Sequence, residues 1–369
     1  AQARAEDVSI LCLPEMCISG YGCEDAFHAP HVYETAWQIL EKDIRPLTKG
    51  MIVSVGLPLR YNNGFYNSAA LLADGEILGF VCKQHLAGDG IHYEPRWFKA
   101  WPQDAVATLY RDGKEYPIGD IYFDVGGIRI GFEICEDAWV ALRPGSDLSF
   151  KGVDVILNPS ASHFSFGKLD VRKGFVKEGS RAFGVTYIYS NLLGNEAGRA
   201  IYDGGALIAA SGQVVTTGPR FSFALWDLTS AVIDIERTRV NRARTVSHRP
   251  VVDVRLDDCV RVEFEYPDVQ PEHNEETAAA WESSENLKEE EFTRALALAL
   301  FDYLRKSWSR GFVVSLSGGA DSAAVVTLSA LAVHLATKEL GLDGIKERLE
   351  YIPGILDCTS PDEIVRLLV

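Results

Sequence analysis

The residues most suited to chemistry are a cysteine and its neighbours near position 135. In residues 127–139 (GIRIGFEICEDAW), apolar residues alternate with polar or small ones, which predicts a strand with one apolar face. The strand brings Cys135 next to Glu133, Glu136 and Asp137. The thiolate is the reactive form of cysteine, and it forms at neutral pH only near a base or a cation. The pattern therefore suits a nucleophile, although a cysteine that only packs in the core fits it too.

A carboxylate and an ammonium group follow two other short apolar runs. Glu15 comes directly after residues 8–13 and Pro14, and Lys83 comes directly after residues 77–82. Strands of one sheet place such residues along a common edge, where active sites are usually built. Each residue taken singly is also typical of a solvated turn or sheet edge. Together with Cys135 they predict a catalytic cluster.

These three segments resemble the motifs of the nitrilase, or carbon–nitrogen hydrolase, superfamily. The segments are 13–22 (LPEMCISGYG), 81–86 (VCKQHL) and 132–139 (FEICEDAW). The resemblance implies an α/β fold, an αββα sandwich, with a Glu15–Lys83–Cys135 triad. It also assigns the family's second glutamate to Glu94, in HYEPRWF. Close relatives usually have an Asn-Tyr pair before that glutamate, whereas this chain has His92 and Tyr93.

The resemblance also implies a reaction, the hydrolysis of glutamine in two acyl transfers. Cys135 attacks the carboxamide carbon, and Glu15 takes the thiol proton and passes one to the departing ammonia. Lys83 keeps Glu15 ionised and stabilises the oxyanion, while Glu94 orients Lys83 or the water. The implied substrate contacts are Tyr21, Ser162 and Lys168. Tyr21 could equally pack in the core, and Lys168 could be a surface charge.

A second candidate site lies in residues 311–322 (GFVVSLSGGADS). The pattern predicts a strand, a glycine-rich loop and then a helix over 322–340, and free N–H groups at such a loop bind anions. The segment has neither the Walker lysine nor a GxGxxG pattern, and an ordinary turn capped by Asp321 or Ser322 is the alternative. SGGxDS resembles the pyrophosphate loop of ATP pyrophosphatases, a Rossmann-like α/β fold. That resemblance implies phosphate contacts, most directly by Ser317, from Ser315, Leu316, Ser317, Gly318, Gly319, Ala320, Asp321 and Ser322.

A glutaminase that releases ammonia, followed by an ATP pyrophosphatase that consumes it, resembles the glutamine-dependent NAD synthetase family. The resemblance implies glutamine, ATP and deamido-NAD as substrates, Mg²⁺ with the ATP, no prosthetic group and a homo-oligomer. Three other interpretations stay open. They are a stand-alone amidase or nitrilase with a vestigial SGGADS loop, an amidotransferase that makes a different amide, and a non-catalytic assembly module.

Composition narrows the class of protein. The chain has 369 residues, 47% hydrophobic and 24% charged, with a net charge of −16, which indicates two soluble domains. No Lys/Arg run suggests nucleic-acid binding. Seven scattered cysteines without a CxxC pair favour a reducing compartment, and we expect a cytoplasmic protein. We expect no membrane-spanning run and no signal peptide. No zinc-ligand spacing occurs, and the position of any metal is left open.

The chain is expected to divide into a nitrilase-like domain over 1–240, a connector over 241–286 and the start of a nucleotide domain over 287–369. Ala1 reads as part of a helix, so we expect the family's first strand to be missing, and the nucleotide domain to be truncated after Val369. Residues 237–249 read as basic and irregular. A four-residue stripe predicts the core face of a helix through Phe292, Leu296, Leu300, Leu304 and Trp308. Further predicted strands cover 51–57, 153–157, 186–189, 206–209 and 232–235, and further helices cover 31–45 and 168–183.

Overall fold

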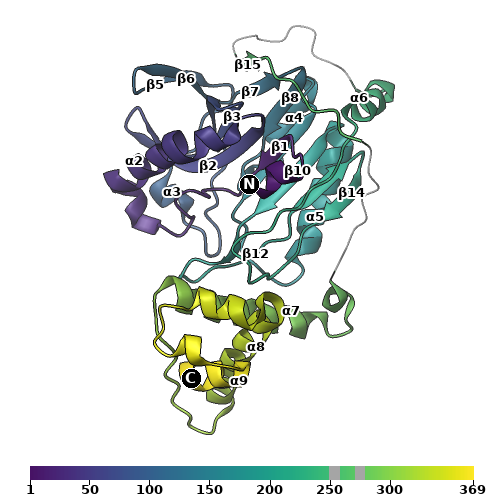
Figure 1. The fold of residues 1–369 in the computed structure, drawn as a ribbon. Coiled ribbons are helices and arrows are strands. Elements are labelled where there is room, and N and C mark those ends of the chain that lie inside the picture. The colour runs from purple at the N-terminus through teal and green to yellow at the C-terminus, as the bar shows by residue number, and fades with distance from the viewer. Residues whose placement is uncertain (249–257, 271–278) are drawn as a thin grey trace.

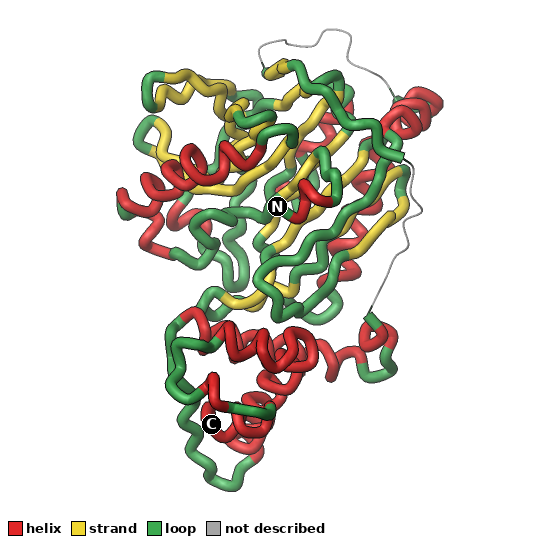
Figure 2. The backbone as a smooth tube through the Cα atoms, in the orientation of Figure 1, coloured by secondary structure: helices red, strands yellow, loops and turns green. Residues whose placement is uncertain are grey.

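In the computed structural model, which describes residues 1–248, 258–270 and 279–369, two β-sheets face each other and helices cover both outer faces (Figures 1 and 2). This αββα sandwich confirms the fold that the motifs imply. The strands are β1 (Ile10–Cys12), β2 (Ile52–Tyr61), β3 (Gly64–Ala73), β4 (Glu76–Cys82), β5 (Val106–Arg111), β6 (Lys114–Gly119), β7 (Tyr122–Val125), β8 (Ile128–Phe132), β9 (Val155–Ser160), β10 (Thr186–Asn191), β11 (Leu193–Asn195), β12 (Ile201–Asp203), β13 (Leu207–Ala210), β14 (Gln213–Thr217) and β15 (Cys259–Val262). The helices are α1 (Gln2–Ala5), α2 (Pro30–Ile39), α3 (Glu94–Trp97), α4 (Pro144–Phe150), α5 (Lys168–Phe183), α6 (Ile235–Arg244), α7 (Leu287–Lys306), α8 (Ala320–Arg348) and α9 (Pro361–Leu368).

The first sheet has six strands in the order β1-β2-β3-β4-β6-β5. Tight turns join β2 to β3 and β3 to β4, as the Asn-Asn-Gly and Asp-Gly patterns predict. Asn62 and Asn63 have φ of 43° and 62°, and Asp74 and Gly75 have φ of 48° and 82°. Positive φ at both central residues gives a turn whose twist matches that of the antiparallel strands it joins. These turns fix the register that places Lys83 directly after β4.

The second sheet has seven strands in the order β14-β13-β10-β9-β8-β7-β15. At its centre β8, β9 and β10 run parallel, so their carboxyl ends meet at one edge. Cys135 follows β8 and Ser162 follows β9, which brings both to that edge.

Three apolar layers hold the sandwich together. Between the sheets, Leu71 and Val81 of the first sheet pack with Phe132 and Leu157 of the second, and all four are nearly or fully buried. Outside the first sheet, α2 contributes Trp37 to the core. Outside the second sheet, α5 contacts β10, β13 and β14, and it spans the residues predicted for it. Burial of both faces fixes each strand's register, since a one-residue slip would reverse its inward side chains.

A helical lobe of α7, α8 and α9 lies at one end of the sandwich, beside β12 (Figure 1). Helix α8 begins at Ala320, slightly before the predicted start, and is kinked at Gly341. The predicted strand before it is wrong, because residues 311–317 form no strand and Val313 is fully exposed. Residues 287–369 are all described and contain no β-strand, so a strand here has no neighbour to pair with.

Among the described residues, α8 is the one helix long and apolar enough to cross a membrane by length and composition. This corrects the expectation that no such run exists. These properties alone are weak evidence for a membrane span, because long core helices share them. Helix α8 packs against both α7 and α9.

Three further predictions about the second half are corrected. No strand forms over 232–235, where the chain enters α6. Residues 237–244 belong to that helix, in which Arg239 and Arg242 pair with the buried Asp154. Within the range expected for the connector, residues 259–262 form β15, which pairs with β7, while 249–257 and 271–278 lie outside the described residues. The α7 stripe is also wrong at its ends, since Phe292 and Trp308 are 49% and 71% exposed.

Candidate active site

A buried lysine between two carboxylates forms the centre of the candidate site. The Nζ of Lys83 donates to Oε1 of Glu15 at 2.7 Å and to Oε1 of Glu94 at 2.7 Å. All three side chains are essentially unexposed. Charges this deeply buried persist only when they are paired and hydrogen-bonded. The structure thus brings together three residues that lie far apart in the sequence.

Local backbone features place Glu15 and Lys83 next to each other. Lys83 follows β4, and its N–H donates to Asn67 O of β3 at 2.9 Å. Glu15 lies in the turn after β1 and crosses directly over Gly56 of β2. A Cβ on Gly56 would lie 2.4 Å from the Met16 nitrogen and 2.8 Å from the Pro14 oxygen. Glycine at position 56 therefore allows the turn to bring its carboxylate over the sheet.

Further donors saturate the two carboxylates. Asn67 Nδ2 donates to Glu15 Oε1 at 2.7 Å, and the Ala161 N–H donates to Glu15 Oε2 at 2.8 Å. Glu94 Oε1 accepts the Tyr21 hydroxyl at 2.7 Å, and Glu94 Oε2 accepts the Ala87 N–H at 2.9 Å. These bonds fix both carboxylates in one orientation each.

Cys135 occupies a sharp turn immediately beyond β8. Its φ is 48°, a left-handed conformation that is unfavourable for a residue with a side chain, and it is 5% exposed. The turn is held by the buried Asp137, which accepts the N–H groups of Ile134 at 3.0 Å and of His85 at 2.8 Å. One carboxylate therefore ties the cysteine turn to the loop that follows Lys83.

The electrostatics of the cluster favour a protonated thiol beside a carboxyl that titrates near neutrality. Burial raises the pKa of Glu15 to about 7, with the Lys83 charge opposing and the Glu94 charge adding to that rise. Burial alone would lower the pKa of Lys83, but the two carboxylates outweigh it and hold that pKa well above its usual value. Burial and the Glu15 charge raise the pKa of Cys135, against Lys83 and a hydrogen bond from the Ala161 backbone. Since Ala161 also donates to Glu15, the thiol and the carboxylate share one amide.

The three predicted substrate contacts border this cluster. Tyr21 reaches it through Glu94, as given above. Ser162 is 3% exposed and its Oγ accepts from Arg172 Nη2 at 3.2 Å. Lys168 begins α5, and its Nζ lies 3.3 Å from His163 Nδ1. Burial, with help from Arg172, lowers the pKa of Lys168 to about 8.

His92, where relatives usually differ, joins these contacts into a chain. Its Nδ1 lies 3.2 Å from the Tyr21 hydroxyl and its Nε2 lies 2.8 Å from His163 Nδ1. Burial and the Lys168 charge lower the pKa of both histidines to about 4, which keeps them neutral near pH 7. Tyr93, the next residue, is 46% exposed and stacks under Arg199 instead.

Two of the acids near Cys135 in the sequence, Glu133 and Asp137, have structural roles. Glu133 is fully buried and pairs with Arg143, and it also accepts the Gly145 N–H at 2.9 Å. Asp137 holds the two loops described above. The carboxylate that reaches the thiol's surroundings is Glu15, which is 120 positions away in the sequence.

The glycine-rich loop forms a separate exposed feature at the start of α8. Gly318 has a φ of 81°, and Ser322 Oγ donates to the Gly319 oxygen at 3.1 Å. Gly319, rather than Asp321 or Ser322, precedes the helix, and no side chain caps it. The first turn of α8 therefore presents backbone N–H groups without a side-chain acceptor, as an anion site requires.

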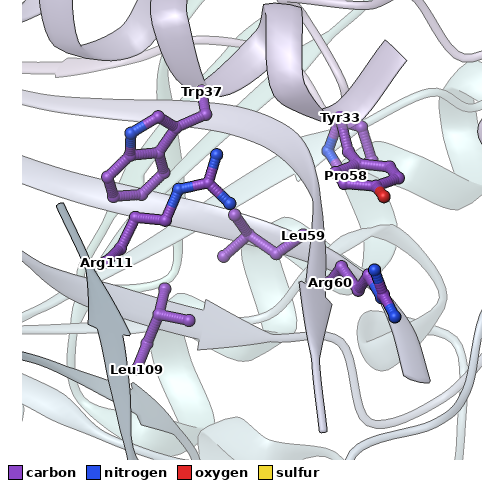
Figure 3. A pocket seen from close by; sticks show the side chains of 7 residues that line it. All are labelled: Tyr33, Trp37, Pro58, Leu59, Arg60, Leu109 and Arg111. Carbon is purple, nitrogen blue, oxygen red and sulfur yellow. The ribbon is translucent and has the colours of Figure 1, made fainter. Parts of the chain in front are cut away.

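Nothing in the described part of the chain forms a metal cluster of three or more His, Cys, Asp or Glu residues. A small cavity of about 10 Å³ lies elsewhere, between α2 and the first sheet (Figure 3). Arg111 lies over the Trp37 ring there, 5.2 Å from its centroid. A cavity of that volume is at the scale of one water molecule, and none of its lining residues belongs to the Glu15–Lys83–Cys135 cluster.

Two participants in the cluster were not predicted from the sequence. Asn67 and the adjacent Ser68 are polar residues before the apolar half of β3, and that interruption was the available signal. The Ala161 amide has no signal, because a backbone N–H looks alike at every position. Both contact Glu15 directly.

An αββα sandwich that buries a lysine between two glutamates beside a cysteine turn defines the carbon–nitrogen hydrolase class. The family model described as carbon-nitrogen hydrolase matches residues 1–242, and the chain belongs to that family. It is 32% identical over 354 residues to a glutamine-dependent NAD(+) synthetase of Oryza sativa subsp. indica, covering 92% of this chain and 48% of that protein. It is also 32% identical to the human glutamine-dependent NAD(+) synthetase, covering 85% of this chain and 46% of that protein.

A solved structure gives the same relationship. The crystal structure of a glutamine-dependent NAD(+) synthetase from Cytophaga hutchinsonii is 38% identical and superposes with a TM-score of 0.77, covering 99% of this chain and 53% of that chain. The chain thus spans about half the length of the curated relatives it matches. The similarity extends beyond the carbon–nitrogen hydrolase domain into the helical lobe.

Proposed function

We propose that this chain is the glutamine-hydrolysing part of a glutamine-dependent NAD synthetase together with the beginning of its ATP-dependent part. The observation that carries the proposal is Lys83, fully buried and shared by Glu15 and Glu94 beside Cys135. That arrangement supplies a nucleophile, a base with a pKa near 7 and a fixed cation. The similarity to these synthetases over almost the whole chain favours glutamine over other amides.

In the proposed reaction, Cys135 attacks the carboxamide carbon of glutamine while Glu15 accepts the thiol proton. The carbonyl oxygen becomes negative and faces Lys83, whose charge stabilises it. Glu15 returns the proton to the leaving nitrogen, so that the C–N bond breaks and ammonia departs from a thioester. Water then adds to the thioester carbon with Glu15 as base, giving glutamate and the free thiol. The sum is glutamine plus water to glutamate plus ammonia.

The geometry also suggests the roles of the neighbouring residues. Glu94 and Asn67 hold Lys83 and Glu15 in line. Tyr21, Ser162 and Lys168 are proposed to bind the rest of the glutamine molecule. At a pKa of about 8, Lys168 keeps most of its charge near pH 7 and suits a substrate carboxylate.

The remaining substrates are also part of this proposal. The SGGADS loop would bind ATP phosphates, with Ser317 and the first N–H groups of α8 as donors. Mg²⁺ would arrive with ATP as substrate, and Asp321 is the carboxylate within that loop. In a protein of the relatives' full length, ATP would adenylate the carboxylate of deamido-NAD with release of pyrophosphate, and ammonia would then displace AMP to give NAD. We further propose a cytoplasmic homo-oligomer that needs neither nucleic acid nor a membrane, a location supported by seven free cysteines.

The test is glutamine hydrolysis by the 369-residue chain, measured as glutamate and ammonia released. Cys135→Ala should abolish it, while Cys259→Ala, which changes a cysteine on β15, should leave it unchanged. Hydrolysis of simple aliphatic amides without hydrolysis of glutamine would instead favour a stand-alone amidase. A folded chain that hydrolyses no amide would favour the assembly module and overturn the proposal.

A further inference from the structure

Two chains of polar contacts, one partly and one fully buried, connect α7 to the candidate substrate contacts. Both pass through the two-stranded hairpin of β11 and β12, which lies between the helical lobe and the sandwich (Figure 1). The first chain leaves the end of β11 and the second leaves the end of β12. Neither contributes an atom to the reaction proposed above.

The first chain starts at Asp302 of α7. Its Oδ2 accepts the Asn195 N–H at 2.8 Å, and Lys306 Nζ donates to the Asn195 oxygen at 2.6 Å. The next residue, Glu196, accepts the N–H groups of Tyr21 at 3.0 Å and of Gly22 at 2.7 Å. The Tyr21 hydroxyl in turn donates to Glu94. Three residues, Asn195, Glu196 and Tyr21, thus link α7 to Glu94, which pairs with Lys83.

The second chain is a cluster of buried charges. Arg220 pairs with Glu291 of α7 at 2.9 Å and with Asp203 of β12 at 3.2 Å. Asp203 also pairs with Arg172 at 2.7 Å, and Arg172 donates to the backbone oxygens of Ser162 and His163 at 2.8 and 3.0 Å. Arg172 is fully buried, and each of the other charged members is at most 6% exposed.

Buried charge clusters of this kind are rigid because each member lacks water as a substitute partner. Withdrawing the Glu291 charge would leave Arg220 with Asp203 and with Glu282, which lies 3.6 Å away, and a shift of Arg220 toward Glu282 would loosen the Asp203–Arg172 pair under Ser162. Withdrawing the Asp302 charge would weaken its bond to the Asn195 N–H, and so loosen the adjoining Glu196, which holds Tyr21. Either change moves a proposed substrate contact without touching Glu15, Lys83 or Cys135.

We propose that α7 holds the substrate-binding side of the amidase site in place through the β11–β12 hairpin, with Glu291 and Asp302 as positioning residues. The inference rests on the proposed function, because it names Tyr21 and Ser162 as the contacts being held. It adds that the helical lobe is needed for substrate binding by the sandwich. A purely structural role for the two chains predicts lower stability with unchanged binding.

The experiment compares Glu291→Gln, Asp302→Asn and the control Glu290→Gln in the 369-residue chain. Glu290 is the neighbouring α7 residue and pairs with Arg294 at the surface. Glu291→Gln and Asp302→Asn should each raise the KM for glutamine about fivefold or more while kcat changes less than about twofold. That is the pattern of lost ground-state binding. Glu291→Asp should recover part of the loss, since it keeps the charge. Melting temperatures identify variants that fail to fold.

A second readout needs no turnover. Iodoacetamide alkylates Cys135, and the glutamine concentration that halves this rate should rise by the same factor as KM. If the wild-type chain neither hydrolyses glutamine nor is protected by it, the proposed function fails. Iodoacetamide is itself a primary amide, so the rate at which it alkylates Cys135 then tests the positioning alone. We expect that rate to fall about threefold in Glu291→Gln and in Asp302→Asn.

Folded Glu291→Gln and Asp302→Asn variants that match Glu290→Gln in KM, protection and alkylation would overturn the inference. If one carboxylate variant does not fold, the other decides, because the two chains leave α7 at different residues. If neither folds, Lys306→Met decides by the same measurements. The Lys306 side chain is 31% exposed, and its replacement leaves Asp302 paired with Arg305, so no buried charge loses its partner.

Discussion

Replacing Lys83 with methionine should produce a loss of stability that depends on pH. The change removes a cation that lies 2.7 Å from two fully buried carboxylates. Removal of one partner from a buried ion pair costs about 3–5 kcal/mol, because the remaining charge is uncompensated. Glu15 can avoid that cost by binding a proton. Its pKa, already about 7 with Lys83 present, should therefore rise further in the variant.

The direction of the pH dependence follows from this shift. The folded-state pKa of Glu15 lies above its ordinary value of 4.5, so the folded state binds more protons between pH 4.5 and about 7. This contribution to stability is fully present below pH 4.5 and is lost as pH rises through the folded-state pKa. In the wild-type chain it amounts to about 3 kcal/mol at most. In Lys83→Met the loss should be larger and should continue above pH 7.

Urea unfolding followed by tryptophan fluorescence at pH 5, 6.5 and 8 measures the effect. We expect Lys83→Met to be less stable than wild type by about 3–5 kcal/mol at pH 8 and by much less at pH 5. Its kcat for glutamine should fall on the order of 10²-fold or more. Lys168→Met is the matched control, which should keep its stability and mainly raise KM. Equal stability losses at pH 5 and pH 8, or kcat within a few-fold of wild type, would refute the reasoning.

Three further predictions follow from individual contacts. The kcat/KM for glutamine should fall below pH of about 7 as Glu15 becomes protonated. Glu94→Gln should move the midpoint of that fall to lower pH, because the Glu94 charge raises the pKa of Glu15. Profiles of kcat/KM against pH check both. Gly56→Ala should displace the turn that carries Glu15, lowering the melting temperature and activity together, whereas Gly174→Ala in α5, where an added Cβ meets nothing within 4 Å, should be stabilised by about 0.5–1 kcal/mol. Asp154→Asn should cost about 2 kcal/mol or more in denaturant unfolding, because two arginines of α6 pair with it, and yet leave kcat unchanged at low temperature.

Local periodicity predicted the elements whose two ends are set by their own residues. Helix α5 begins after Gly167 and ends before Gly184, both with positive φ, and its predicted bounds are confirmed. The turns at 62–63 and 74–75 are confirmed for the same reason, since their residue types fit positive φ. The motifs also brought Glu15, Lys83 and Cys135 into one cluster, which the structure reproduces.

Periodicity failed where an element depends on distant partners, and where a fixed residue spacing was extended over many helical turns. Residues 311–315 have a strand's composition, but a strand forms only beside another strand. The α7 stripe used a strict four-residue spacing, which drifts around a helix with about 3.6 residues per turn. Leu304 is buried as predicted, but it packs with Leu298 and Phe301, while Phe292 and Trp308 are exposed. The segment 232–235 is apolar at its start, but Asp234 caps α6, which already begins at Ile235.

Charge pairing was the least predictable feature from the sequence, and it carries the coupling between the two parts of the chain. Arg172, Asp203, Arg220 and Glu291 span 119 positions and look like ordinary surface residues in their local contexts. Only the fold shows that they are buried and mutually paired. The boundary also holds a hydrophobic cluster, in which Phe221 and Phe223 pack with Phe301 of α7, but dispersion is not directional and tolerates small shifts. Arg220 instead faces three carboxylates, those of Asp203, Glu282 and Glu291, and its fixed fork of N–H donors makes such pairing directional. The boundary between sandwich and helical lobe is therefore better suited to holding Ser162 and Tyr21 at fixed positions than to acting as a hinge.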